Sequence, residues 1–368
     1  MTFSIAERLR PFSHQPGTFC LLPGTAYAVQ VFPTLLRLFR LDGSFPELLR
    51  EYHLVLKGPF KDFTVQKDLE KGVIRVWGEA SCGFIRYEIE AQREEEIAFF
   101  LDKAPQGRLI MQDKEDEQSV LIHQPVDLLN LSNGLQISLP AIKHAGHERL
   151  SLGNHKSQDW DLVKRRLDLV EIFPVWHRLS QWIPSFPNRS IESGMQRLLL
   201  KCEETINHNR PDESASSWTQ LFQAAFQGIL VPFWHDEYFQ GIVDSAFPIV
   251  DQSPLVILKQ GMHLMRRHFI EQQQNVVTLL PVLPPELHCG RLLNVQLDDK
   301  GTLDLEWTKK VIRRVSLHSH SDQELVCHFK KTERCRFRKN GTEKGVWIRS
   351  GERLALEKNC HYLFDNFN

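Results

Sequence analysis

One short run of residues carries groups that could bind or cleave a sugar. It comprises Trp234, His235, Asp236 and Glu237, in a segment expected to be a loop. A glycosidase needs two carboxylates that flank the scissile bond, so we predict Asp236 and Glu237 as catalytic candidates. We predict that Trp234 and His235 bind the substrate, because rings stack on apolar sugar faces while polar groups meet hydroxyls. In the alternative interpretation, the two acids favour the positive end of the next helix and Trp234 is a core residue.

A second group consists of three histidines in the middle of the chain. His144, His147 and His155 could together hold a zinc ion, as in a metal-dependent hydrolase with an open site. Their spacings lack the helical i, i+4 pair of the HExxH motif, which the sequence does not contain. The other interpretation makes them ordinary loop histidines at a domain junction. We therefore predict no metal and no cofactor.

Two further features lie near the C-terminus. His318 and His320 share one face of an expected strand, with Asp322 close by, but two ligands are too few for a metal ion. A basic cluster follows, made up of Lys330, Lys331, Arg334, Arg336, Arg338 and Lys339. We interpret the cluster as a solvated turn and strand face, with binding of an anionic ligand as the alternative. The formal net charge of -1 argues against a general nucleic-acid binder.

Strands are expected at both ends of the chain, from about residue 18 to 140 and again after 275. Ile85, Tyr87 and Ile89 alternate with charged residues, which is typical of a strand with one buried face and one wet face. Similar short alternating segments recur on both sides of the central region. The pattern predicts two antiparallel β-sandwiches.

Helices are expected in the middle, where apolar residues recur at threes and fours. The expected helices cover 160–173, 190–208, 214–230 and 254–273. Pro174 should kink or end the first of them, with the pattern continuing to residue 184. The segment 181–187 places aromatics between prolines, so we expect a stiff connection that docks the helices against a sheet.

The region after the last expected helix resembles a known family. Residues 276–284 read VVTLLPVLP, and the strand 303–307 reads LDLEW. This resembles the end of bacterial α-L-fucosidases of the helical-barrel type. In that family the final barrel helix runs into an LLPALP segment, and a small β-sandwich opens with a Val-Asp-x-x-Trp strand. The strand here keeps Trp307 and has a carboxylate before it, at Glu306.

The resemblance implies a large β-sandwich first, then helices, then a small β-sandwich, and it implies a carbohydrate as the ligand. It covers about 90 residues near the C-terminus. The chain departs from the family in its helical section, where 155–273 holds too few helices to close a barrel. No residue matches the catalytic acid or base of the family. No active-site residue of this chain can therefore be assigned from the resemblance.

We predict an α+β multidomain fold with an N-terminal β-sandwich over 1–152, a short helical section over 153–275 and a C-terminal β-sandwich over 276–368. The protein is expected to bind carbohydrate or to be a degenerate glycoside hydrolase, and the residues leave catalysis open. The alternative is a non-enzymatic scaffold whose β faces bind a protein partner.

The expected location is the cytoplasm. Seven scattered cysteines without a CxxC pair suggest reduced thiols. The start of the chain has no apolar signal region, and no apolar run approaches the ~20 residues that span a bilayer. We expect no membrane partner and no nucleic-acid partner.

Overall fold

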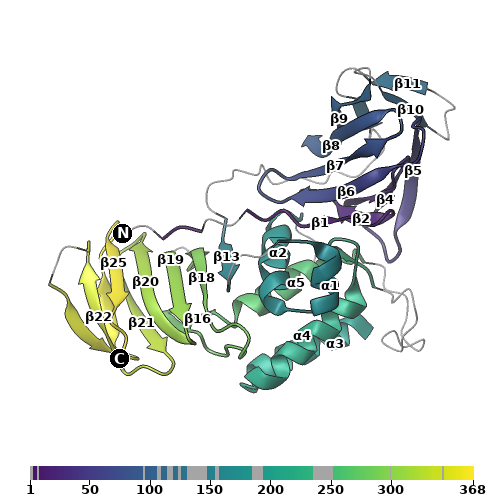
Figure 1. Cartoon of the computed structure of the whole chain (residues 1–368). Coiled ribbons are helices and arrows are strands. Elements are labelled where there is room, and N and C mark those ends of the chain that lie inside the picture. Colours follow the sequence, from purple (N-terminus) through teal and green to yellow (C-terminus); the bar gives the residue numbers. More distant parts are fainter. Residues whose placement is uncertain are drawn as a thin grey trace.

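The computed structural model describes residues 3–5, 8–93, 96–105, 109–113, 119–122, 126–130, 147–153, 157–184, 194–234, 252–298, 300–341 and 344–368. Two groups of β-sheets lie at opposite ends of the molecule, with the helices between them (Figure 1). The predicted fold class, a mostly β α+β protein with several antiparallel sheets, is confirmed.

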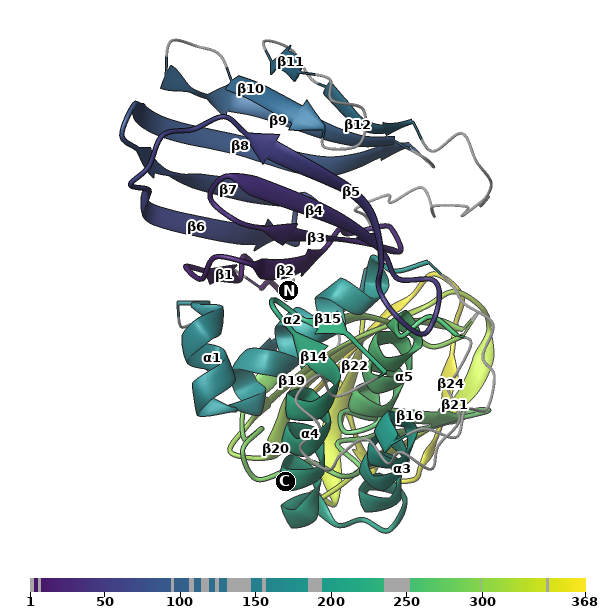
Figure 2. The ribbon, with the colours of Figure 1, turned by 90° about the vertical axis from the view of Figure 1, so that its right-hand side faces the viewer.

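The N-terminal sandwich consists of two six-stranded sheets. The first sheet contains, in order, β1 (Phe12–Ser13), β6 (Lys61–Asp68), β7 (Val73–Ala80), β8 (Gly83–Arg93), β9 (Glu96–Lys103) and β12 (Val126–Asn130). The second contains β11 (Ser119–Ile122), β10 (Leu109–Asp113), β5 (Glu47–Leu54), β4 (Leu35–Arg40), β3 (Tyr27–Val31) and β2 (Thr18–Leu21). Ile85, Tyr87 and Ile89 are buried, as their alternation predicts. Figure 2 shows this sandwich stacked on the helical layer.

The C-terminal sandwich consists of a seven-stranded and a four-stranded sheet. The seven-stranded sheet contains β13 (Arg149–Leu152), β18 (Gly290–Gln296), β19 (Gly301–Thr308), β20 (Val311–Ser319), β25 (His361–Asp365), β22 (Arg334–Lys339) and β23 (Val346–Arg349). The four-stranded sheet contains β16 (Ile270–Gln273), β17 (Val276–Leu279), β21 (Gln323–Phe329) and β24 (Arg353–Leu356). One pairing was not expected, because β17 runs parallel to β21. In addition, β13, which we placed with the first sandwich, pairs with β18.

The first expected helix is two helices in the structure. The helix α1 (Trp160–Arg166) ends at Leu167, whose backbone is left-handed with φ 54°, and α2 (Leu169–Gln181) starts directly after it. The expected end of the helix at Pro174 is wrong, because α2 runs through this residue. Pro174 has no N–H to donate to the carbonyl of Val170, so it costs α2 one backbone hydrogen bond without ending the helix. The break therefore falls seven residues earlier than the sequence suggested.

The later helices are α3 (Gly194–Asn207), α4 (Pro211–Ala225) and α5 (Leu255–Arg266). Two of them, α4 and α5, end earlier than expected, while the expected start of α3 at 190–193 lies outside the described residues. The expected extension of α4 to residue 230 is wrong, because Gly228 and Leu230 have positive φ and the hairpin β14 (Phe226–Gln227) and β15 (Val231–Pro232) forms instead. The expected extension of α5 to residue 273 is also wrong, since Ile270–Gln273 is a strand paired with β17.

Buried hydrogen bonds fasten the helices to the N-terminal sandwich. Trp182 donates from Nε1 to the carbonyl of Leu69 in the turn after β6 at 3.0 Å, so this residue holds the helices to the N-terminal sandwich. Residues 185–187 of the same predicted connection lie outside the described residues. Lys67 on β6 is fully buried and donates from Nζ to the carbonyl of Ile229 at 2.6 Å. None of the helices in the described part of the chain combines the length and hydropathy needed to cross a bilayer.

Candidate functional site

Of the four residues in the predicted sugar site, the structure describes one. Trp234 is 2% exposed and donates from its indole nitrogen to the carbonyl of Gln252 at 2.6 Å. This placement agrees with the alternative interpretation, in which Trp234 is a core residue. His235, Asp236 and Glu237 lie outside the described residues, so their catalytic and binding roles stay predictions.

The histidine group is also described in part. His144 and His155 lie outside the described residues, while the carbonyl of His147 accepts a hydrogen bond from Asn294 at 3.2 Å. Within the ranges that the structure describes, no group of three or more histidine, cysteine, aspartate or glutamate side chains could hold a metal ion.

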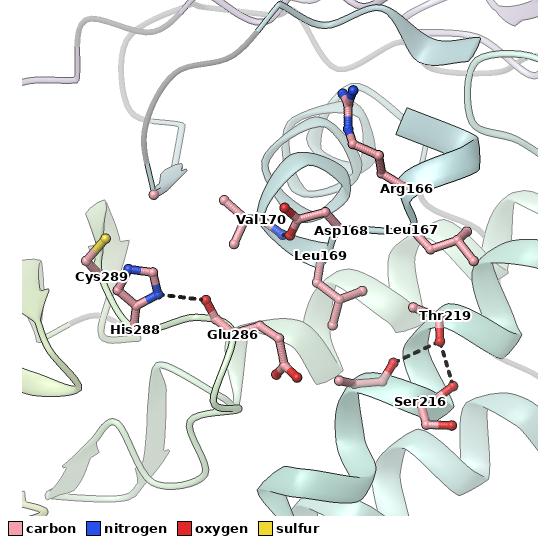
Figure 3. Close-up of a pocket in the computed structure, with 12 residues that line it drawn as sticks. Arg166, Leu167, Asp168, Leu169, Val170, Ser216, Thr219, Glu286, His288 and Cys289 are labelled. Atoms are coloured by element: carbon pink, nitrogen blue, oxygen red, sulfur yellow. Dashed lines mark hydrogen bonds between the residues drawn. The ribbon is translucent and has the colours of Figure 1, made fainter. Parts of the chain in front are cut away.

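One hollow lined by described residues lies where the helices meet the C-terminal sandwich, and we call it the junction cleft (Figure 3). Its volume is about 870 Å³. Four chain segments supply the walls: the residue after β13, the α1–α2 break with the start of α2, one face of α4, and the loop before β18. The described lining residues are Gly153, Arg166, Leu167, Asp168, Leu169, Val170, Ala215, Ser216, Thr219, Glu286, His288 and Cys289.

Several polar side chains of the junction cleft already have partners within the protein. The Asp168 carboxylate caps α2 by accepting from the N–H of Val170 at 2.9 Å. Thr219 donates from its hydroxyl to the carbonyls of Ala215 and Ser216. Glu286 enters from the opposite wall and turns toward Ser216 rather than toward Asp168 (Figure 3). The cleft therefore offers one uncommitted carboxylate, and no Trp, Tyr or Phe among its described lining residues.

The second hollow lies on the C-terminal seven-stranded sheet, and we call it the sheet groove. Its volume is about 510 Å³. Leu303, Leu305 and Leu317 point into the core, so the residues between them on β19 and β20 point outward. The described lining residues are Asn294, Thr302, Asp304, Ser316, His318, Asn340, Gly341, His361, Tyr362 and Leu363.

Three carboxylates of this sheet differ in their partners. Two of them are each held by two arginines. These sets are Glu306 with Arg291 and Arg314, and Asp365 with Arg336 and Arg338. In each set one arginine Nε lies 2.7 Å from a carboxylate oxygen. Although burial opposes it, these arginines hold the pKa values of Glu306 and Asp365 below their ordinary range.

Asp304 in the sheet groove is the exception. Among the described residues it has one hydrogen bond, from the backbone N–H of Asn294 at 2.9 Å, and no ion pair. Burial raises the pKa of the Asp304 carboxyl, and the hydrogen bond from Asn294 offsets this only in part. A half-buried carboxylate without a cation retains unused acceptor capacity, which a bound donor can meet.

The groups around Asp304 also have free hydrogen-bonding capacity. Ser316 lies opposite Asp304 in the strand register, and Thr302 lies opposite His318. The rings of His318 and His361 stack with centroids 4.2 Å apart. Burial and the neighbouring histidines lower the pKa of His318, so this imidazole is neutral near pH 7. In the part of the chain that the structure describes, the side chains of Thr302, Ser316, His318 and His361 make no hydrogen bond.

The sequence analysis missed Asp304. It singled out His318 but gave it only a metal-binding role, which it rejected. One signal was available: Thr302 and Asp304 alternate with Leu303 and Leu305, which places them on an outer face. The register that brings these side chains beside β20 and β25 joins segments about 15 to 60 residues apart, and no local pattern encodes it.

No protein-family model matches this chain, and none of the curated proteins compared with it matches it either. The functional argument therefore rests on the geometry of the two hollows and on the residues that line them.

Proposed function

We propose that the protein binds a carbohydrate in the sheet groove. The observation that carries this proposal is Asp304, the carboxylate of the seven-stranded sheet that has no arginine partner among the described residues. The neighbouring Glu306 and Asp365 are each neutralised by two arginines. Asp304 is therefore available to accept hydrogen bonds from a ligand.

The composition of the groove favours a polyhydroxylated ligand over a charged one. The hydroxyls of Thr302 and Ser316 and the imidazoles of His318 and His361 both donate and accept, which suits the hydroxyls of a sugar. The described lining contains no lysine or arginine, which an anionic ligand would need. Leu363 supplies an apolar contact for the face of a sugar ring.

The family resemblance supports the same ligand class. The LLPVLP segment and the LDLEW strand resemble α-L-fucosidases of the helical-barrel type. We propose that this chain is a non-catalytic relative of such glycoside hydrolases. We also propose that it acts in the cytoplasm, a view supported by its seven cysteines, all of which are free.

A thermal-shift screen against simple sugars, including fucose, tests the proposal. A ligand that binds only the native state raises the melting temperature by mass action. We expect one sugar class to raise it for the natural protein and for Asp212→Asn, an exposed helix position that serves as the matched control. The rise should be lost in Asp304→Asn.

The same screen separates the sheet groove from the loop predicted by sequence. If Asp236→Ala loses the shift while Asp304→Asn keeps it, the ligand binds at the sequence-predicted loop and the sheet groove is wrong. If no sugar produces a shift at millimolar concentration, the carbohydrate proposal itself fails.

A further inference from the structure

A second surface, independent of the sheet groove, lies at the free edge of the seven-stranded sheet. The strand β23 is the last in the order of this sheet and, among the strands that the structure describes, pairs with β22 alone. Val346 is 61% exposed and Trp347 is 51% exposed, which is unusual for two adjacent large apolar residues. An exposed edge strand with apolar side chains is a template for pairing with another strand.

The backbone of this edge has unpaired groups. The N–H of Ser350 donates to the carbonyl of Glu333 at 2.9 Å, so these two residues form a hydrogen-bonded pair at the end of the ladder between β23 and β22. Along an antiparallel ladder, hydrogen-bonded pairs alternate with pairs whose backbone groups point away from the partner strand. By this alternation, Val346 and Ile348 bond to β22, while Trp347 and Arg349 turn their backbone groups outward. Glu352 meets both backbone groups of Arg349. Its carboxylate accepts from the Arg349 N–H at 2.8 Å, and its backbone N–H donates to the Arg349 carbonyl at 3.1 Å. Trp347 has no such partner among the described residues.

The charge around Trp347 is positive. Arg334 lies over the indole ring, with its guanidinium carbon 5.0 Å from the ring centroid. Arg349 and Lys344 are exposed and form no ion pair with any described residue. On the adjoining strand β22, Arg336 and Arg338 share Asp365 of β25, and the Glu352 carboxylate lies against the backbone of Arg349. The surface therefore has an excess of cations beside two apolar side chains.

We propose that this edge binds an extended acidic segment of a partner protein, which adds to β23 as a further strand. Backbone pairing would meet the outward groups of Trp347, and Val346 and Trp347 would contact apolar residues of the segment. The unpaired cations would select acidic side chains. A second copy of this chain does not fit, because two β23 edges would bring their arginines together. This gives a physical basis for the protein partner considered from the sequence.

Fluorescence anisotropy with the full chain tests the proposal. The probes are three labelled octapeptides: alternating Glu and Val, alternating Lys and Val, and the acidic peptide N-methylated on alternate residues. We expect the acidic peptide to bind, with the affinity falling as salt is added. Trp347→Ala should weaken binding about tenfold, as expected for loss of an aromatic anchor. Arg349→Glu should weaken it several-fold.

The matched controls are Ile110→Ala, a half-exposed apolar residue of the other sandwich, and Arg313→Glu, an exposed arginine of β20. Both should bind the acidic peptide as the natural protein does, and thermal unfolding should confirm that every variant is folded. Strand pairing requires that the N-methylated peptide fail to bind. Equal binding of the acidic and N-methylated peptides, or no binding of the acidic peptide at about 1 mM, would overturn the proposal.

Discussion

The junction cleft and the sheet groove differ in how their polar side chains are used. The cleft is the larger, at about 870 Å³ against about 510 Å³. Yet Asp168 and Thr219 in the cleft already bond to the backbone of their own helices. In the groove, Asp304 has a single hydrogen bond and the hydroxyls and imidazoles beside it have none within the described ranges. Among the described lining residues, the sheet groove therefore has more side chains with free hydrogen-bonding capacity than the junction cleft, although its volume is smaller.

The contrast has a simple origin in secondary structure. A helix begins with N–H groups that lack an intrahelical partner. A polar side chain at that point accepts hydrogen bonds from them as a cap, and it is then not available to a ligand. A strand inside a sheet has its backbone groups met by its neighbours, so its outward side chains stay available. The sheet groove exploits this on β19 and β20, where alternation sends one residue in two to the surface.

The substitution that most sharply tests the comparison is Asp304→Asn. It keeps the size of the side chain but replaces one acceptor oxygen with a donor. We expect sugar affinity to fall at least tenfold, or about 1.4 kcal/mol, because the ligand hydroxyls lose a charged acceptor. Isothermal titration of both proteins measures the change. An unchanged affinity would remove Asp304 from the site.

The next largest effect is expected for a substitution in the junction cleft, which should change the free energy of unfolding and leave sugar binding unchanged. Asp168→Ala removes the cap of α2 and should lower the free energy of unfolding by about 1 kcal/mol. Sugar affinity should stay the same. Chemical denaturation and titration check the two parts separately. A loss of affinity without a loss of stability would make the cleft the binding site.

A smaller effect is expected in the pH dependence of stability. Because the pKa of Asp304 is raised in the folded state, the native protein holds this proton at a higher pH than the unfolded chain. The stability that Asp304 contributes is therefore full below the ordinary aspartate pKa and is lost as pH rises through the raised value. Asp304→Asn should gain stability relative to the natural protein between pH 4 and pH 7. Unfolding curves at both pH values measure this gain, and a relative loss would contradict the assignment.

The smallest effect is expected for Glu286→Gln in the cleft. Glu286 is exposed, and its side chain forms no ion pair with a described residue. Substitutions at such surface positions change stability by less than about 0.5 kcal/mol. Affinity for the sugar should not change either. A large loss of binding would show that the cleft contributes a working carboxylate.

The sequence predicted the β, α, β order and the inward faces of individual strands, because both depend on local periodicity. Ile85 and Leu303 are buried as their alternation indicates. It placed the α1–α2 break at Pro174 instead of Leu167, since a left-handed leucine leaves no local signal. It also missed Asp304. This residue differs from Glu306 and Asp365 in having no arginine partner among the described residues, and that difference depends on which arginines lie beside each carboxylate. That pattern arises from strand pairing across the sheet.

The central claim is that the ligand binds in the sheet groove, and NMR of the histidine rings tests it most directly. Ring signals of His318 and His361 can be assigned by substituting each residue in turn. Titration with the sugar found in the thermal screen should shift both signals. The shifts should reach half of their final size at a free sugar concentration equal to the dissociation constant measured by calorimetry. If the sugar binds while both signals stay in place, the ligand site lies elsewhere and the groove assignment is wrong.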